Sequence, residues 1–123
     1  MQSSYPTATY TEKRSKFIGC FAKVDTEEDC KAFLASVKKE YKGASHYVYA
    51  YILANNLIRY SDNGEPHGTG GGRLLGVLQH NNVVGGMLVV VRYFGGKKLG
   101  TGPLGRAYAT AAQETYALVK DET

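Results

Sequence analysis

In two long stretches of the chain, apolar residues recur every three or four positions, so that each stretch would form an apolar stripe along one side of a helix. These residues are Cys30, Phe33, Leu34, Val37 and Tyr41 in the first stretch, and Leu104, Ala107, Tyr108, Ala111, Ala112, Thr115, Tyr116 and Val119 in the second. Thr26, followed three residues later by an aspartate, is a typical helix cap, and Pro103 is a favoured first helical residue. The pattern predicts helices over 26–42 and 103–119, with a short helix over 73–80.

Four further stretches have the pattern of β-strands. Expected strands cover 16–24, 46–54, 57–60 and 87–94. In the second of these, tyrosines alternate with aliphatic residues, and the two asparagines that follow predict a hairpin turn. The last is an almost unbroken apolar run, as in a buried strand. Residues 1–12 are polar and are expected to be extended or frayed. Together, the elements predict an α+β fold of two layers, a four-stranded sheet with two helices on one face.

The composition is that of one ordinary globular domain. The 123 residues are 43% apolar and 21% charged, and the longest purely apolar run, Met87–Val91, is far shorter than a membrane helix. The first residues lack the basic and apolar parts of a signal peptide. These features predict a soluble, cytoplasmic protein with a single domain over 1–123. Cys20 and Cys30 have no metal-ligand spacing and are expected to be reduced, buried side chains.

The positive charges are unevenly distributed. The formal net charge is +4, and no aspartate or glutamate occurs between Pro66 and Gln113. The cations in that interval are Arg73, Arg92, Lys97, Lys98 and Arg106. An interval whose charged residues are all positive favours phosphate-bearing or acidic partners, although a merely solvated basic face is an equally good interpretation.

Glycine is concentrated in the same half of the chain. Thirteen of the fifteen glycines lie between residues 64 and 105, most of them in the segments 61–72 and 95–103. Glycines let backbone amides approach a phosphate or carboxylate, and the second segment leads into a predicted helix start. Either segment could instead be a purely structural connection. The dinucleotide-binding and Walker patterns are both missing from the sequence.

No group of residues in the sequence points to catalysis. The serines lack the context of a nucleophile elbow, and no His-Glu-x-x-His motif occurs. Asp62 and Glu65 are the acids of the glycine-rich half, and acids beside turn residues more often bond backbone amides than bind magnesium. We therefore expect both to hold segment 61–72 through amides or a basic neighbour such as Arg92 or Arg106. No catalytic residue, metal ligand or cofactor is assigned.

Tyr47, Tyr49 and Tyr51 share one face of their predicted strand. If that face is exposed, the three rings form an aromatic strip on which bases of single-stranded RNA could stack, with Arg92 or Lys97 nearby. If a helix covers the face, the row is part of the core. The alternation leaves both interpretations open.

Several motifs, in the same order along the chain, together resemble the N-terminal domain of the IMPACT/YigZ family. They are Lys13–Ile18, His46–Tyr51, Ser61–Pro66, Gly68–Gly71, Val89–Gly102 and Arg106–Tyr108. Because these motifs are long and span nearly the whole chain, the resemblance is specific. The loop residues that it marks are Ser61, Asp62, Gly64, Glu65, Pro66, Gly68, Thr69, Gly95, Gly96, Gly100 and Gly102.

The resemblance implies the fold of a ribosomal small-subunit protein domain, which is shared with elongation factor G and the GHMP kinases. Bacterial family members usually carry a second, ferredoxin-like domain, to which no part of this sequence corresponds. Eukaryotic relatives restrain the amino-acid starvation response by competing for the activator of an initiation-factor kinase.

Two classes of function follow from this resemblance. The first is a non-enzymatic binding module in translation or its regulation, whose partner is RNA, the ribosome or a translation-regulatory protein. The second is an enzyme that binds a phosphate-bearing small molecule in the glycine-rich loops, although the GHMP phosphate-loop sequence does not occur here. We favour the binding module. Its expected polyanion- or partner-binding residues are Arg73, Arg92, Lys97, Lys98, Arg106, Tyr47, Tyr49 and Tyr51.

Overall fold

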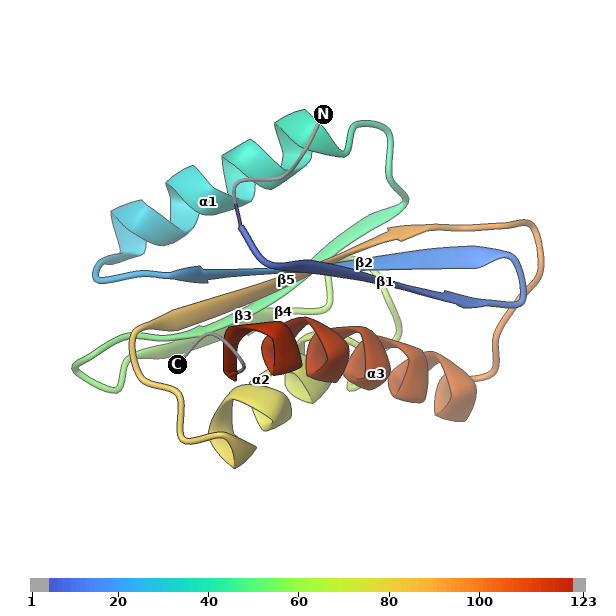
Figure 1. The fold of residues 1–123 in the computed structure, drawn as a ribbon. Helices are drawn as coiled ribbons and strands as arrows, with labels where there is room; N and C mark the ends of the chain where they lie inside the picture. Colours follow the sequence, from blue (N-terminus) through green and yellow to red (C-terminus); the bar gives the residue numbers. More distant parts are fainter. Residues whose placement is uncertain (1–4, 121–123) are drawn as a thin grey trace.

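The structure is a computed structural model that describes residues 5–120, and this part of the chain forms one five-stranded antiparallel sheet and three helices (Figure 1). The strands are β1 (Thr7–Glu12), β2 (Ser15–Lys23), β3 (His46–Ile52), β4 (Ile58–Ser61) and β5 (Gly86–Tyr93). The helices are α1 (Glu27–Glu40), α2 (Gly71–His80) and α3 (Thr101–Lys120). The strand order is β1-β2-β5-β3-β4, so β5 lies at the centre of the sheet.

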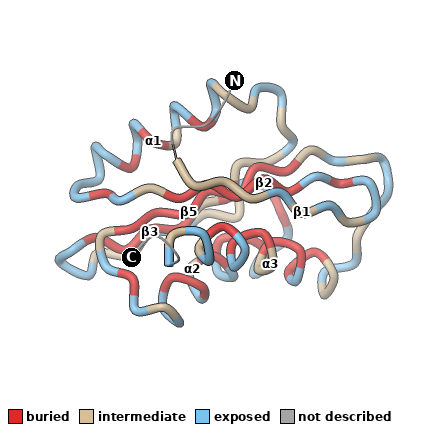
Figure 2. Tube along the Cα trace, viewed as in Figure 1, coloured by how far each residue is buried: buried red, intermediate tan, exposed pale blue. Residues whose placement is uncertain are grey.

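The helices cover both faces of the sheet, which gives the domain three layers. In Figure 1, α1 lies on one face, and α2 and α3 lie together on the other. Leu88 and Val90 of β5 belong to the core beneath α2 and α3, whereas Val89 belongs to the core beneath α1. Six of the nine residues of β2 and seven of the eight residues of β5 are consequently buried (Figure 2). The expected two-layer arrangement, with helices on one face, is therefore wrong.

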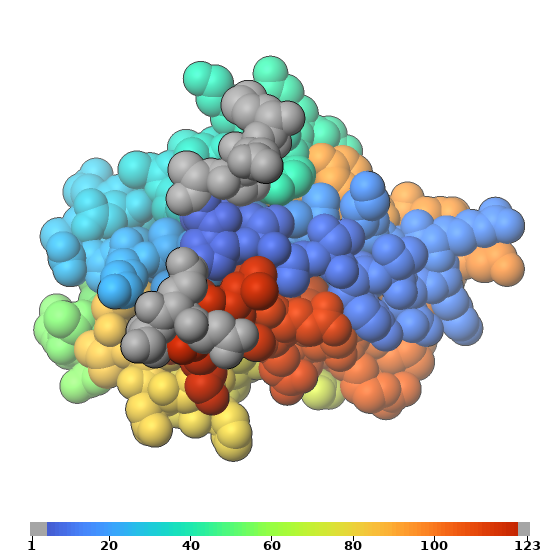
Figure 3. Space-filling model, viewed as in Figure 1, coloured from blue at the N-terminus to red at the C-terminus, as the bar shows by residue number. Residues whose placement is uncertain are grey.

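The sequence pattern did not predict β1, and the sheet has five strands instead of four. Residues 7–12, expected to be frayed, pair with β2 from Thr7 opposite Cys20 to Glu12 opposite Ser15. β1 is an edge strand at the surface between α1 and α3 (Figure 3). Its side chains are mostly small or polar and stay half-exposed, so they show no apolar alternation. Residues 1–4 of that expectation lie outside the described residues.

The other predicted elements are confirmed, with ends shifted by one or two residues. Thr26 caps α1 as expected. Its Oγ1 accepts a hydrogen bond from the amide of Asp29 at 3.1 Å, and the Asp29 carboxylate accepts one from the amide of Thr26 at 3.2 Å. α3 begins two residues before Pro103, which is its third residue rather than its first.

α3 lies unusually close to the sheet where it crosses β2. A Cβ added to Gly19 would overlap Oγ1 of Thr115 and would lie 2.9 Å from the carbonyl oxygen of Ala111. Glycine is the one residue that permits this approach without displacing the helix. The contact fixes the position of α3 relative to β2, and with it the position of Tyr108 on the same helix.

Cys20 and Cys30 are buried and free, as the sequence predicts. Burial raises the pKa of the Cys20 thiol to about 12 and that of the Cys30 thiol to about 11. Both thiols are therefore protonated at neutral pH and poorly nucleophilic. Within residues 5–120, no helix is long and apolar enough to cross a membrane.

Candidate functional site

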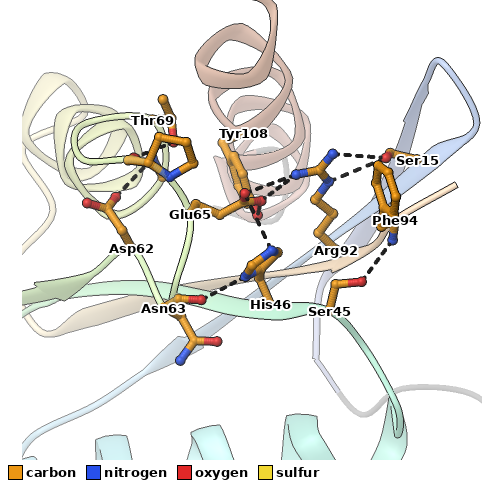
Figure 4. Close-up of polar contacts among 12 residues, drawn as sticks. Ser15, Ser45, His46, Asp62, Asn63, Glu65, Thr69, Arg92, Phe94 and Tyr108 are labelled. Carbon is orange, nitrogen blue, oxygen red and sulfur yellow. Dashed lines mark hydrogen bonds and ion pairs between the residues drawn. The ribbon is translucent and has the colours of Figure 1, made fainter. Parts of the chain in front are cut away.

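A buried ion pair joins Arg92, near the end of β5, to Glu65, in the loop between β4 and α2 (Figure 4). Nη1 of Arg92 donates to both carboxylate oxygens, at 3.0 and 2.8 Å, and Nε and Nη2 donate to Oγ of Ser15, at 3.3 and 3.2 Å. Only 7% of the Arg92 side chain and 3% of the Glu65 side chain are exposed. Arg92, predicted as part of an exposed polyanion-binding surface, is therefore not accessible to a partner in this structure.

Two further side chains contact the Glu65 carboxylate. The hydroxyl of Tyr108 donates to Oε2, and burial, reinforced by this hydrogen bond, raises the pKa of Tyr108 above its usual value. Nε2 of His46 lies 3.5 Å from Oε1, while Nδ1 lies 2.8 Å from the carbonyl oxygen of Asn63. Because a carbonyl oxygen only accepts, Nδ1 carries a proton. The residues Ser15, His46, Glu65, Arg92 and Tyr108 are together named the ionic centre.

Asp62 holds the rest of the glycine-rich loop. Its carboxylate accepts hydrogen bonds from the amides of Gly68 at 3.2 Å, Gly70 at 3.0 Å and Gly71 at 2.8 Å. The last two amides lie at the start of α2, where backbone donors have no partner within the helix. The expectation that Asp62 and Glu65 bond backbone amides and a basic neighbour is thus confirmed. Within residues 5–120, no three His, Cys, Asp or Glu side chains form a group that could hold a metal ion.

Replacing Asp62 by alanine should lower the free energy of unfolding by about 1–3 kcal/mol, because buried amides lose a charged acceptor. Asp62→Asn retains one carbonyl oxygen for the amides at the start of α2 and should be affected less. Urea denaturation of the two variants checks this. Equal damage by both substitutions, or none by alanine, would show that the carboxylate does not hold the loop.

Four exposed cations lie where two chain segments meet at one end of the sheet. Lys13 and Arg14 form the turn between β1 and β2, and Lys97 and Lys98 lie in the loop between β5 and α3. The two segments are side by side in Figure 1, and a Cβ added to Gly95 would overlap the carbonyl oxygen of Arg14. The residues Lys13, Arg14, Lys97 and Lys98 are named the basic end. The sequence predicted the two loop lysines as binding residues but did not predict that Lys13 and Arg14 lie beside them.

The β1–β2 turn has an unfavourable backbone conformation. Lys13 has a φ of 45° and Arg14 a φ of 70°, both in the left-handed region. A two-residue hairpin turn with positive φ at both positions favours Asn-Gly, because side chains other than those of Gly, Asn and Asp rarely adopt this conformation. Strain of this kind is often found at functional positions. The only sequence signal was the place of these two residues in a family motif.

Arg73 and Arg106, the other predicted cations, are exposed on the layer formed by α2 and α3. Arg73 packs over α3, where a Cβ added to Gly105 would lie 2.9 Å from its Nη2. Neither α2 nor the part of α3 before Glu114 carries an acidic residue. The two helices of the acid-free interval thus form a layer on which Arg73 and Arg106 are exposed.

The tyrosine row lies on the sheet face that α1 covers. Tyr51 is buried, and Tyr47 and Tyr49 are half-buried. The hydroxyl of Tyr47 donates to the carbonyl oxygen of Tyr41 at 2.6 Å, and that of Tyr51 donates to Oε1 of Glu27 at 3.0 Å. These bonds tie the row to α1 and the residue after it, so its role in the structure is packing rather than the display of an open aromatic strip.

The fold and the site define a three-layer α+β module with a buried ionic centre and a cluster of cations in its exposed loops. The chain belongs to the IMPACT family, because the model of the Impact N-terminal domain matches residues 13–116. The resemblance inferred from the loop motifs is thereby confirmed. The implied relation to a ribosomal protein and elongation factor G stays a prediction.

Several curated proteins are similar to this chain. It is 38% identical over 114 residues to an IMPACT family member of Haemophilus influenzae, which corresponds to 89% of this chain and 55% of the relative. It is 38% identical over 104 residues to YvyE of Bacillus subtilis, covering 83% of this chain and 48% of YvyE. With YigZ of Escherichia coli it shares 41% identity over 100 residues, 78% of this chain and 49% of YigZ. The chain thus spans about half the length of these curated relatives.

Two solved structures have a similar fold. A crystal structure described as that of a hypothetical protein aligns with a TM-score of 0.86 and 36% identity, over 90% of this chain and 56% of that one. The two-domain translational regulator Yih1 aligns with a TM-score of 0.59 and 24% identity, over 96% of this chain and 48% of Yih1. The second likeness concerns the fold alone.

Proposed function

We propose that this chain is a non-enzymatic binding module that acts in translation or its regulation by binding RNA, either free or within the ribosome. The observation that carries the proposal is the basic end, where a strained turn presents Lys13 and Arg14 beside Lys97 and Lys98. Lysine and arginine at exposed turns are suited to phosphate contacts, which supply most of the affinity of non-specific RNA binding.

The acids in the neighbouring segments offset only part of the charge of the basic end. The Glu65 carboxylate is paired with Arg92, and that of Asp62 accepts three backbone amides. Glu12, beside the turn, accepts a hydrogen bond from the neutral hydroxyl of Tyr10 and keeps its charge, so it offsets one of the four cations. The exposed lysines and arginines therefore dominate the local potential, which attracts a polyanion.

The role in translation rests on the fold and the family. Yih1, which shares the fold, is a two-domain translational regulator. A translation-regulatory protein is the competing partner, but the cores of protein interfaces are depleted in charged residues, whereas the basic end consists of them. RNA is therefore the better match for this surface.

The proposal predicts that RNA affinity falls steeply with salt. A fluorescently labelled RNA hairpin with single-stranded arms, titrated at several salt concentrations, should give a linear log–log relation, because phosphate contacts release counterions. Lys97→Ala combined with Lys98→Ala should reduce the magnitude of the salt slope by about 2, roughly one unit for each lost phosphate contact.

Lys23→Ala combined with Lys31→Ala is the matched control, since it removes the same charge from the far end of β2 and from α1. The control should leave the slope nearly unchanged. Absence of RNA binding at low salt, or equal effects of the two double variants, would contradict the proposal. Capture of a non-ribosomal protein from lysate that persists after nuclease treatment would favour the protein partner instead.

A further inference from the structure

A hollow of about 280 Å³ lies beside the basic end and the ionic centre. Its apolar wall consists of Pro66, Phe94, Leu99 and Leu104, and Lys98 of the basic end also lines it. The remaining lining residues belong to the ionic centre. Sites for drug-sized ligands measure roughly 300–1,000 Å³, so this hollow is suited to a ligand with a single ring system.

Phe94 is the aromatic residue of this hollow, and it is held in place. It follows β5 directly, 48% of its surface is exposed, and its amide donates to Oγ of Ser45 at 3.1 Å. The guanidinium carbon of Arg92 lies 5.5 Å from the centre of the ring, and Arg92 is itself fixed by Glu65 and Ser15 (Figure 4). The ring is therefore preorganised, and a planar ligand can stack on it at little entropic cost.

Polar groups in the lining complement the aromatic ring. Nε2 of His46, whose side chain is 24% exposed, can form a hydrogen bond with the edge of a heterocyclic base, whereas Oε1 of Glu65, 3.5 Å away, only accepts and belongs to a side chain that is 3% exposed. The ammonium group of Lys98 supplies a charge for a phosphate attached to the same ligand. An aromatic ring, polar groups for a base edge and a cation for a phosphate are what proteins use to bind an unpaired nucleotide.

We propose that this hollow binds one unpaired nucleotide of an RNA, with the base stacked on Phe94 and a neighbouring phosphate on Lys98. The proposal rests on the proposed function, since it specifies which part of an RNA the module recognises. In an RNA duplex both faces of a base are covered by its neighbours, so only a loop, bulge or single strand can supply this nucleotide. The basic end then holds the flanking phosphates.

The test uses Phe94→Trp, which introduces a sole tryptophan into a chain that has none. A single-stranded RNA oligomer should quench the fluorescence of this tryptophan on stacking, whereas a duplex of the same sequence at the same phosphate concentration should not. Val84→Trp is the matched control, because Val84 is 54% exposed and precedes β5, at the opposite end of the strand from Phe94. Its fluorescence should change equally little with both RNAs.

Loss of the ring gives the second measurement. Phe94→Ala should weaken binding of the single-stranded oligomer by roughly 5- to 150-fold, the range found for removal of one stacking aromatic residue. The salt slope should stay unchanged, in contrast to the effect of the Lys97 and Lys98 substitutions. Phe94→Leu keeps an apolar side chain without a π face and should lose the same affinity, which separates stacking from any unfolding of the alanine variant.

The outcomes distinguish this inference from the proposed function. The nucleotide site is overturned if RNA binds with a normal salt slope while the tryptophan is not quenched and both the Ala and the Leu variants keep full affinity. The proposed RNA-binding function would survive that result. Quenching by a duplex as strong as by the single strand also overturns it. If adenosine or uridine monophosphate quenches the tryptophan at lower concentrations than the oligomer does, the ligand of the hollow is a free nucleotide, and the inference that it binds a nucleotide of an RNA is wrong. Failure of the wild-type chain to bind any RNA refutes the proposed function itself.

Discussion

Replacing Arg92 by methionine is expected to lower the free energy of unfolding by about 3–5 kcal/mol, because it leaves the Glu65 carboxylate charged and buried without its cation. Glu65 is 3% exposed, and the hydroxyl of Tyr108 and the ring of His46 cannot replace the two hydrogen bonds that Nη1 of Arg92 donates. Urea denaturation, followed by circular dichroism, measures the loss.

Arg59→Met is the matched control, since Arg59 is exposed on the edge strand β4 and makes one backbone hydrogen bond at 3.0 Å. It should change stability by no more than about 0.5 kcal/mol. The double variant Glu65→Leu with Arg92→Met should be more stable than Arg92→Met alone, because no buried charge remains. If Arg92→Met costs no more than Arg59→Met, the ionic centre does not stabilise the fold.

The second large effect concerns the β1–β2 turn and has two parts of opposite sign. Lys13→Asn combined with Arg14→Gly should raise the free energy of unfolding by about 1–2 kcal/mol, because Asn-Gly suits the left-handed conformation that Lys and Arg adopt at a cost. The same double variant should bind RNA more weakly and reduce the salt slope by about 2, since two phosphate contacts are lost. Thermal denaturation and RNA titration measure the two parts.

Lys13→Gln combined with Arg14→Gln separates charge from backbone strain. Glutamine removes the charge but relieves no strain, so this variant should lose the same RNA affinity without gaining stability. A stabilised Asn-Gly variant that binds RNA as tightly as the wild-type chain would show that the turn is strained for a reason unrelated to RNA. Destabilisation by Asn-Gly would show that the turn does not strain the fold.

The sequence predicts best where the signals are local. α1 could be placed because its cap at Thr26 and its apolar positions all lie within about fifteen residues, which the structure confirms. The apolar run 87–94 correctly indicated a buried strand. It did not reveal that helices cover both faces, because the stripes of α1 and α3 do not specify the face on which each helix packs. β1 escaped prediction because an edge strand needs few apolar side chains.

The site was harder to predict because its contacts are distant in sequence. Arg92 was placed on the surface, as an arginine beyond an apolar run usually is. Its partners Glu65 and Ser15 lie 27 and 77 residues away. One signal was present: Arg92 has the same parity along β5 as Leu88 and Val90, so it faces α2 and α3. For Lys13 and Arg14, nothing in the residue types indicated a hairpin turn.

The central position of β5 determines when the domain can form during synthesis. β5 follows the other four strands in the sequence, yet it pairs with both β2 and β3. Until it has emerged from the ribosome, the earlier strands can form only two separate hairpins, which are marginal in water. The sheet must therefore close late, with β5 entering between strands already made. At that moment a slip of one residue would turn Arg92 toward α1 and leave Glu65 unpaired, so the ion pair selects the correct register.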